Sequence, residues 1–276
     1  MALSVHEKLN LAADWLRAAD GLLVTAGAGM GVDSGLPDFR GRAGFWRAYP
    51  VLKPVGINFE DIASPDAMRR MPTLAWGFYG HMLGLYRKTE PHDGFNILRH
   101  WGERMEHGLF VFTSNVDGHF QKAGYPDDRI VECHGSIHFL QCFKTCSRNI
   151  WSANMVDPQV DANSCRLQSD IPTCPKCGAM ARPNVLMFDD YDWIDDRTEL
   201  QQERMERWLS RVSRLVVVEL GAGKAIPTVR MLSEKNGPRI IRINPRDFAI
   251  ASYRGVGIPG RALEVLGMLN ALLVAG

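Results

Sequence analysis

The sequence predicts an α/β fold in which a parallel β-sheet is covered by helices on both faces. Five short apolar runs are strand candidates, and each ends in a polar or glycine-containing segment: residues 21–26, 109–113, 130–133, 215–220 and 239–243. Continuous apolar strands separated by helices are typical of parallel sheets that are buried on both sides. Such sheets bind ligands at the carboxyl ends of their strands, so the segments after the five runs are expected to share one cleft.

Composition and charge limit the classes of function. Apolar residues make up 46% of the chain, enough for a sizeable core, and 32 Lys and Arg against 31 Asp and Glu give a net charge of +1. A nucleic-acid-binding surface usually needs a clear basic excess, so we expect no nucleic-acid partner. The chain has no run of about 18 apolar residues and no signal-peptide pattern at its start. We therefore expect no membrane partner and a cytoplasmic location.

Six cysteines gather in one part of the chain, at Cys133, Cys142, Cys146, Cys165, Cys174 and Cys177. A disulfide framework would normally spread further and belong to a secreted protein, so a metal site fits better. Two close pairs, Cys142 with Cys146 and Cys174 with Cys177, supply the four thiolates of a structural zinc site. Cys165 as a replacement ligand, or a set of unligated thiols, are the less favoured alternatives.

The cysteine segment divides the chain into two unequal parts. Residues 137–187 are expected to form a small zinc-binding module, because a closed four-thiolate site folds its segment and does no chemistry. Residues 1–136 and 188–276 are expected to form the larger domain. Within it, residues 42–107 are predicted to be a helical insertion, since proline and glycine interrupt helical patterns there.

A glycine-rich turn follows the first predicted strand. Gly27, Gly29 and Gly31 allow a tight turn and the close approach of the backbone to a pyrophosphate group. These glycines alone are a weak signal, which a dehydrogenase would share, but the extension from Ser34 to Arg40 makes the pattern far more specific. The turn therefore predicts dinucleotide binding by a Rossmann-like domain.

The turn and its extension resemble the nucleotide-binding loop of the sirtuin family, Gly-Ala-Gly-x-Ser-x-x-Ser-Gly-Ile-Pro-Asp-Phe-Arg. The matching residues are Gly27, Ala28, Gly29, Ser34, Gly35, Pro37, Asp38, Phe39 and Arg40. Gly31 stands where the family usually has Ser, and Ala26 where it usually has Thr. The resemblance implies that NAD is bound as a co-substrate, with its phosphates at residues 27–29.

The same resemblance gives the end of this segment a role. It implies that Asp38, Phe39 and Arg40 lie in a loop over the nicotinamide ribose. Phe39 would then shield the reactive carbon from water, a role that suits an apolar ring. A core position for Phe39 and a solvated surface charge for Arg40 are the alternatives.

The loop after the second strand carries an amide and a carboxylate. Asn115 and Asp117 stand two residues apart at a strand end, where both side chains can point into one pocket and bind an amide group. The sirtuin segment is Thr-Gln-Asn-Ile-Asp, and the resemblance implies that this pair holds water and the nicotinamide amide. Ser114 replaces the Gln that touches the nicotinamide ribose. An ordinary Asx-turn is the alternative for the pair, and His119 is expected to be structural.

A histidine follows the third strand. The free pKa of histidine, near neutrality, suits it for taking a proton from a sugar hydroxyl. In sirtuins the histidine of a His-Gly pair is the general base, and His134 occupies that position. The implied reaction joins the acyl-lysine oxygen to the ribose carbon that loses nicotinamide, after which His134 helps a ribose hydroxyl attack the imidate. Asn115 completes the expected catalytic pair, and Cys133 is expected to be buried and no nucleophile.

The far end of the NAD site is predicted from two later segments. Residues 219–227 resemble the sirtuin segment that contains Gly-Thr-Ser, and the resemblance implies that Gly221, Ala222 and Gly223 contact NAD. Asn244 matches the family's Ile-Asn and would meet the adenine ribose. Lys224 is either a phosphate contact or a solvated lysine.

The substrate side departs from the family pattern. Residues 182–190 resemble the sirtuin segment Arg-Pro-x-Val-Val-x-Phe-Gly-Glu, whose strand edge pairs with the substrate peptide. Asp189 stands at the position of the Gly. Sirtuins that remove acidic acyl groups carry Tyr and, three residues later, Arg. Here Tyr79 is followed by Met82, so we expect a neutral acyl group and not succinyl or malonyl.

These patterns predict an NAD-dependent protein-lysine deacylase, similar to a deacetylase, which releases nicotinamide and O-acyl-ADP-ribose. Its partner would be an acyl-lysine protein. An ADP-ribosyltransferase or NAD hydrolase of the same fold is the first alternative, because Ser114 and the Phe-Asp-Asp segment depart from the pattern. A non-catalytic NAD or ADP-ribose sensor is the second, and the presence of Asn115, Asp117 and His134 counts against it.

Overall fold

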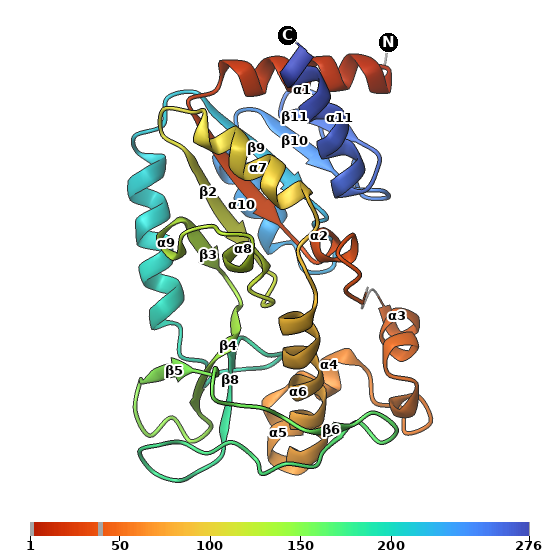
Figure 1. The fold of residues 1–276 in the computed structure, drawn as a ribbon, viewed down its shortest axis with the longest axis vertical. Coiled ribbons are helices and arrows are strands. Elements are labelled where there is room, and N and C mark those ends of the chain that lie inside the picture. Colours follow the sequence, from red (N-terminus) through yellow and green to blue (C-terminus); the bar gives the residue numbers. More distant parts are fainter. Residues whose placement is uncertain (1–2, 38–40, 276) are drawn as a thin grey trace.

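The apolar runs form a six-stranded, wholly parallel sheet in the upper lobe of the molecule (Figure 1). The computed structural model describes residues 3–37 and 41–275. In sheet order the strands are β11 (Gly255–Ile258), β10 (Ile240–Ile243), β9 (Leu215–Leu220), β1 (Gly21–Ala26), β2 (Leu109–Thr113) and β3 (Ile130–Glu132). Five of them coincide with the predicted runs, and β11 is an additional edge strand.

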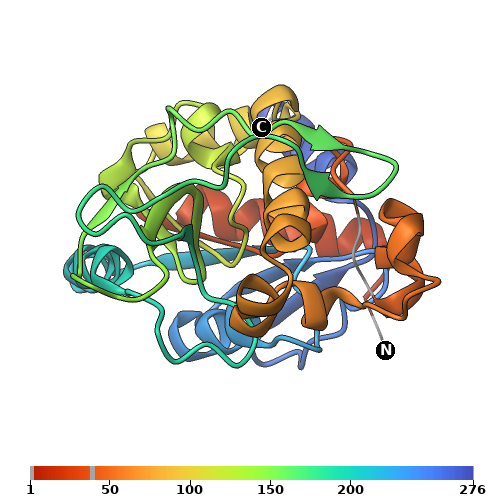
Figure 2. The ribbon, with the colours of Figure 1, turned by 90° about the horizontal axis from the view of Figure 1, so that it is seen from below.

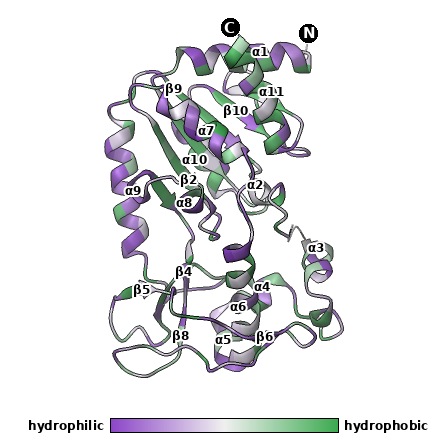
Figure 3. Cartoon of the chain, in the orientation of Figure 1, coloured by the Kyte–Doolittle hydropathy of each residue, from purple (hydrophilic) through white to green (hydrophobic). Residues whose placement is uncertain are grey.

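Both faces of this sheet are covered because its strands are apolar on both sides. Leu22 and Val24 pack with α1 (Val5–Ala18), α7 (Gly94–Glu103) and α11 (Ala262–Ala275). Leu23, between them, points to the other face and packs with side chains of α9 (Asp196–Leu209) and α10 (Thr228–Asn236). Figure 3 shows the result, with apolar strands inside and a largely hydrophilic α9 outside. The predicted fold class is confirmed.

The lower lobe combines helices with the cysteine-rich segment. Its antiparallel sheet has the order β5 (Ile150–Ser152), β4 (Gly135–Cys142) and β8 (Ala181–Val185), and a hairpin of β6 (Val160–Asp161) and β7 (Arg166–Leu167) lies against α6 (Figure 2). Its helices are α3 (Gly41–Ala48), η1 (Pro50–Leu52), α4 (Phe59–Ile62), α5 (Pro65–Arg70) and α6 (Pro72–Lys88). Phe78, Leu140 and Val185 belong to one core shared by both parts.

The boundaries of the lobes differ in detail from the predicted domains. The helices that share a core with the cysteine segment end at Lys88. α7, which falls within the predicted helical insertion, packs on the parallel sheet of the upper lobe. Three short elements complete the fold: α2 (Gly29–Val32), α8 (His119–Lys122) and η2 (Asp127–Arg129).

The helices are short compared with a lipid bilayer. α6, the longest helix within the described ranges, has 17 residues, whereas a membrane span needs about 20 mainly apolar residues. None of the helices formed by residues 3–37 and 41–275 is long and apolar enough to cross a membrane.

A neutral histidine ties the glycine-rich turn to the start of α7. His92 donates from Nε2 to the carbonyl oxygen of Met30 at 3.1 Å, and its Nδ1 accepts the N–H of Gly94 at 3.0 Å. A ring that donates from one nitrogen and accepts at the other carries no positive charge. Burial accordingly lowers the pKa of His92, and it also lowers the pKa values of His81, His119 and His134.

These histidines predict a loss of stability in mild acid. Because their folded pKa values lie below the unfolded value of about 6.5, the unfolded chain binds more protons there. The free energy of unfolding, measured by urea denaturation, should therefore fall as the pH drops below about 6.5. His92→Asn keeps an acceptor for the Gly94 N–H and should flatten this dependence, whereas the exposed control His6→Asn should not. If the free energy of unfolding of His92→Asn kept the pH dependence of the wild type, His92 would not contribute to the loss of stability in acid.

Candidate functional site

The loops after β1, β2 and β3 begin side by side and are hydrogen-bonded to one another. In the sheet register Ala26 lies opposite Thr113, and Thr113 lies opposite Glu132. The Ser114 N–H donates to the carbonyl oxygen of Ala26 at 3.1 Å, and Asn115 Nδ2 donates to that of Gly27 at 3.1 Å. The carboxyl end of the sheet is therefore the shared edge that the sequence predicts.

The glycine-rich turn is packed against the loop after β9. A Cβ atom on Gly29 would lie 2.7 Å from Gly221 Cα, and one on Gly27 would lie 2.9 Å from Ala222 Cα. Gly221 has a φ of 59°, in the left-handed region that glycine adopts readily. Two backbone segments therefore meet with no room for a side chain between them.

Gly31 stands at the position where the family pattern has serine, and its surroundings leave no room for a side chain. A Cβ atom on Gly31 would lie 2.8 Å from Leu36 Cδ1 and 3.6 Å from Asp117 Oδ2. Leu36 is buried and occupies the space that a serine side chain would need. The glycine at residue 31 thus leaves room for the Leu36 side chain.

Three predicted site residues, Asp38, Phe39 and Arg40, lie outside the described residues. Their expected position over the nicotinamide ribose stays a prediction.

Asn115 and Asp117 are held by their own loop. The Asn115 N–H donates to Thr113 Oγ1 at 3.0 Å, while its side chain reaches Gly27. Asp117 is buried, and its Oδ1 accepts the N–H of His119 at 2.9 Å. This last bond is the Asx-type turn considered as an alternative, so one carboxylate oxygen is used locally. The other, Oδ2, faces the glycine-rich turn around Gly31.

His134 lies where the parallel sheet meets the lower lobe. Burial lowers the pKa of this half-buried side chain, and the nearby backbone carbonyl of Ser114 opposes the shift. The ring is therefore mostly neutral at pH 7, as a proton acceptor must be. The His134 carbonyl oxygen accepts the N–H of Leu186 at 3.0 Å. Gly135 follows with a φ of 74°, and a Cβ there would lie 2.1 Å from the Asn184 carbonyl oxygen, so a glycine is required.

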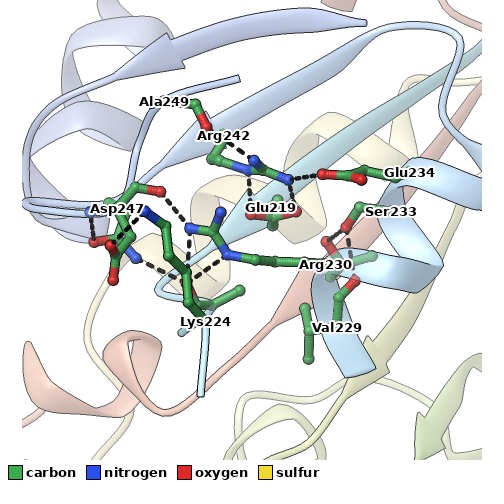
Figure 4. A network of polar contacts seen from close by, with 12 residues as sticks. Glu219, Lys224, Val229, Arg230, Ser233, Glu234, Arg242, Asp247 and Ala249 are labelled. Carbon is green, nitrogen blue, oxygen red and sulfur yellow. Dashed lines mark hydrogen bonds and ion pairs between the residues drawn. The ribbon is translucent and has the colours of Figure 1, made fainter. Parts of the chain in front are cut away.

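The loops after β9 and β10 are joined by polar side chains (Figure 4). Asn244 is buried; its Nδ2 donates to the Ala222 carbonyl at 3.0 Å, and its Oδ1 accepts the N–H groups of Arg246 and Asp247 at 3.0 and 2.9 Å. The buried guanidinium of Arg230 donates to the carbonyls of Ala222 and Asp247. The side-chain amide of Asn244 thus makes hydrogen bonds within the protein that connect the loop after β9 with the loop after β10.

An ion pair that could not be predicted from the motifs joins the two strands that precede these loops. Arg242 Nε and Nη2 donate to Glu219 at 2.6 and 3.0 Å, and Nη2 also donates to Glu234 at 2.9 Å (Figure 4). Arg242 and Glu219 are register partners on adjacent strands. A single opposite charge in each of two otherwise apolar strands is the signal that could have revealed the pair.

A cavity of about 240 Å³ opens beside these loops. It is lined by Gly29 and Gly221 on one side and by residues after β10 and at the start of α11 on the other, including Ile243, Arg246 and Arg261. The predicted contact residue Gly223, by comparison, is half-buried and has open space beside its Cα.

The predicted substrate segment forms the edge of the lower sheet. β8 pairs with β4 on one side and, within the described part of the chain, has no strand on the other. The buried side chains of Arg182 and Asp190 pair beneath it, and Arg182 also donates to the Val185 carbonyl at 2.7 Å. Tyr79 and Met82 are both buried in the core of the same lobe. The free strand edge is the geometry that peptide binding by strand addition requires.

Asp189, which stands where the family pattern has glycine, adopts the left-handed backbone conformation that glycine favours, with a φ of 53°. A left-handed conformation costs an L-residue about 1–2 kcal/mol, of which the greater flexibility of an unfolded glycine would offset part. Asp189→Gly should therefore raise the free energy of unfolding by about 0.5–1 kcal/mol in urea denaturation. Asp192→Gly, which removes a nearby exposed carboxylate without a positive φ, should give no such gain, and an equal gain would assign the effect to charge.

The four predicted zinc ligands come together in the lower lobe. Within residues 3–37 and 41–275, the sulfur atoms of Cys142, Cys146, Cys174 and Cys177 all lie within 4.8 Å of one another. The Sγ atoms of Cys142 and Cys177 are 3.6 Å apart, and those of Cys146 and Cys174 are 3.7 Å apart. Tetrahedral zinc with bonds of about 2.3 Å would place its sulfur ligands about 3.8 Å apart. The four thiols therefore fit a zinc ion, and Cys165 is not part of the group.

The three-residue spacing of the first cysteine pair is accommodated by its turn. The Thr145 N–H donates to the Cys142 carbonyl at 3.1 Å, and Thr145 has a φ of 47°. The second pair uses Gly178 in the same way, with its N–H on the Cys174 carbonyl at 2.9 Å and a φ of 69°. One residue in the left-handed region closes each turn.

Comparison with known proteins agrees with this geometry. Residues 27–211 match the Sir2 family. The chain is 31% identical to an NAD-dependent protein deacylase of Thermococcus kodakarensis, over 94% of this chain and 93% of that one. It is 32% identical to NAD-dependent protein deacylase 2 of Pyrobaculum aerophilum, over 93% and 92%.

Solved structures show the same fold. A Sir2 homologue in complex with NAD is similar with a TM-score of 0.73 at 22% identity, covering 96% of this chain and 94% of that one. A mutant Sir2 homologue in complex with ADP-ribose has a TM-score of 0.71 at 24% identity, with 95% of each chain covered.

Proposed function

The chain belongs to the Sir2 family, and on that premise we propose that it is an NAD-dependent protein-lysine deacylase that consumes NAD and releases nicotinamide and O-acyl-ADP-ribose. The observation that carries this proposal is the position of His134. This histidine stands between the loops at the carboxyl end of the parallel sheet and the β8 segment, to which its carbonyl is bonded through Leu186. A base at that junction can act on a dinucleotide on one side and a peptide on the other.

The dinucleotide would lie across the carboxyl end of the sheet. The backbone of Gly29 and Gly221, which lines the cavity, supports binding of the pyrophosphate, because a glycine allows close approach without a side chain. Asn115 and Asp117 Oδ2 are suited to the nicotinamide carboxamide, since an amide can both donate and accept. Asn244 would hold in place the loops after β9 and β10, which contact the adenosine half of the dinucleotide.

His134 would accept a proton from a ribose hydroxyl during acyl transfer. Its lowered pKa keeps the ring neutral and able to take a proton at pH 7. Once the acyl oxygen has displaced nicotinamide from the ribose carbon, the hydroxyl oxygen bonds to the acyl carbon. The lysine amine then leaves with a proton, and addition of water leaves the acyl group as an ester on ADP-ribose. Gly135, which pairs with Val185 and adopts a φ of 74° close to Asn184, sets the direction of the backbone after the base.

The acyl-lysine protein would add its backbone to the free edge of β8, as extended peptides do. Tyr79 and Met82 are buried in the adjoining core, and Met82 offers no cation for an acidic acyl group. A neutral group such as acetyl is therefore the expected substrate. A cytoplasmic location remains part of the proposal.

Incubation with NAD, with and without an acetyl-lysine peptide, tests the proposal. Nicotinamide release that depends on the peptide, with loss of acetyl, would support deacylation, and a succinyl-lysine peptide should react far more slowly. Release without peptide would replace the proposal by NAD hydrolysis, and ADP-ribose attached to protein would replace it by transfer. Bound NAD without turnover would indicate a sensor.

A further inference from the structure

We propose that His138 is a positioning residue for the nicotinamide half of the dinucleotide, because it holds the loop that carries Asn115 and Asp117. This inference rests on the proposed function for the role of those two side chains, and on the hydrogen bonds around the loop for the role of His138. His138 lies on β4 in the lower lobe, outside the motifs from which the site was predicted. It acts on the dinucleotide through the backbone of the loop.

The loop between β2 and α8 is held by both lobes. On the side of the upper lobe, Asn115 Nδ2 donates to the Gly27 carbonyl at 3.1 Å. On the side of the lower lobe, the N–H of Ile137 donates to the Val116 carbonyl at 3.1 Å, and the Val116 side chain packs against the core of that lobe. The position of the loop is therefore set by β4 as well as by the parallel sheet, and Figure 1 shows β4 directly below β3 and α8.

His138 supplies a second hydrogen bond from β4 to this loop. Its Nε2 lies 2.8 Å from the carbonyl oxygen of Asp117, and because a carbonyl only accepts, Nε2 carries the hydrogen. The ring also packs against the turn: a Cβ atom on Gly118 would lie 2.7 Å from His138 Cδ2 and 2.8 Å from Nε2. Gly118 has a φ of 70°, so a glycine there allows both the turn and the close approach of the ring.

The backbone of His138 is fixed within the lower lobe. The pairing of β4 with β8 shifts register between Ser136 and Leu140, so His138 stands in a bulge, and bulges commonly redirect a side chain. Its carbonyl oxygen accepts the N–H of Ala153 at 2.8 Å, and Ala153 is fully buried. The half-buried ring therefore extends from a fixed backbone, which favours a constant position of the Nε2 donor.

The consequence for Asp117 is a carboxylate with one oxygen to offer. Oδ1 accepts the N–H of His119 at 2.9 Å, and Oδ2 faces the glycine-rich turn around Gly31. In the proposed function, Asp117 Oδ2 and Asn115 bind the nicotinamide carboxamide. A displaced loop should therefore weaken binding of NAD but not of ADP-ribose, which lacks the nicotinamide group.

Calorimetry with NAD and with ADP-ribose tests the role of His138. His138→Phe keeps an aromatic ring but removes the donor, and it should raise the Kd for NAD about three- to tenfold, the usual effect of losing one hydrogen bond. The Kd for ADP-ribose should not change. His138→Gln returns an N–H donor at a similar reach and should restore the Kd for NAD. The control His100→Phe, on the exposed surface of α7, should change neither Kd.

Turnover gives a second measurement. His138→Phe should lower the rate of nicotinamide release by roughly tenfold, because the bond to be broken is no longer held in place. The KM for the acetyl-lysine peptide should stay at the wild-type value, since β8 is not altered. His138→Gln should recover most of the rate.

Different results overturn different claims. An equal rise in the Kd values for NAD and ADP-ribose in His138→Phe would show a general disturbance of the cleft and would overturn the positioning role. Unchanged Kd values, or a folded His138→Gln that behaves like His138→Phe, would also overturn it. Absence of turnover in the wild type would remove the proposed function, while the comparison of NAD with ADP-ribose would still decide the role of His138. Thermal melting of each variant would establish that it is folded.

Discussion

Replacing His134 with alanine is expected to lower the rate of deacylation by about 10²–10⁴-fold, the usual contribution of a general base. The change should leave the Kd for NAD nearly unaltered. The reason lies in the contacts of this residue: its carbonyl oxygen, which alanine retains, bonds to Leu186, whereas the ring lies near the backbone of Ser114. The variant therefore loses the proton acceptor without losing the hydrogen bonds that join β3 to the lower lobe.

Single-turnover deacetylation and calorimetry with NAD, on the same preparation, would separate the two effects. The wild-type rate should also fall as the pH drops through the lowered pKa of His134, because only the neutral ring accepts a proton. His100→Ala, on the exposed surface of α7, is the matched control and should keep full activity. Deacylation at the wild-type rate by His134→Ala would show that another group is the base.

The five strands of the parallel sheet that are continuous apolar runs could be predicted from the sequence. The sixth strand, β11, is not such a run and could not be predicted. β11 reads Gly-Val-Gly-Ile, a pattern that resembles a turn. Its glycines are needed for packing: a Cβ on Gly255 would lie 2.0 Å from the Ile240 carbonyl oxygen, and one on Gly257 would lie 2.0 Å from that of Phe248. Such close backbone contacts depend on distant residues, so no local pattern reveals them.

The strands of the lower lobe also lack a local sequence pattern that would predict them. β8 contains Pro183, which argues against a central strand. The structure accommodates the proline because β8 is an edge strand within the described residues, and the register between β4 and β8 shifts between Ser136 and Leu140. The sequence of residues 137–187 therefore shows no clear strand pattern, although β4 is eight residues long.

The candidate site could be predicted as far as its residues form local motifs. The glycine-rich turn, Asn115, Asp117 and His134 each follow a strand, and parallel pairing brings strand ends together. The bonds that fix them could not be predicted, because they join loops far apart in the chain. Asn244 illustrates the difference: its position at a strand end was predictable, but its use in holding Ala222 and Arg246 depends on folding.

Replacing Cys174 with serine is expected to release most of the zinc and to destabilise the lower lobe by several kcal/mol. Binding to a structural four-ligand site contributes about 10–16 kcal/mol in small zinc-binding peptides, and removing one thiolate forfeits a large part of it. Cys142 lies at the end of β4, and Cys174 and Cys177 precede β8. The metal would thus join the two strands that carry Gly135 and the proposed peptide edge, at the end of β4 opposite to Gly135.

Metal analysis should give about one zinc per chain for the wild type and far less for Cys174→Ser. Thermal melting should show a lower Tm for the variant, and chelation of the wild type should lower the Tm in the same way. Cys165→Ala, which changes a buried cysteine outside the group of four, should keep its zinc. If Cys174→Ser retained a full equivalent of zinc, the four-thiolate assignment would be wrong. If it lost zinc but kept its Tm and its KM for the peptide, the metal would not be what orders the substrate edge.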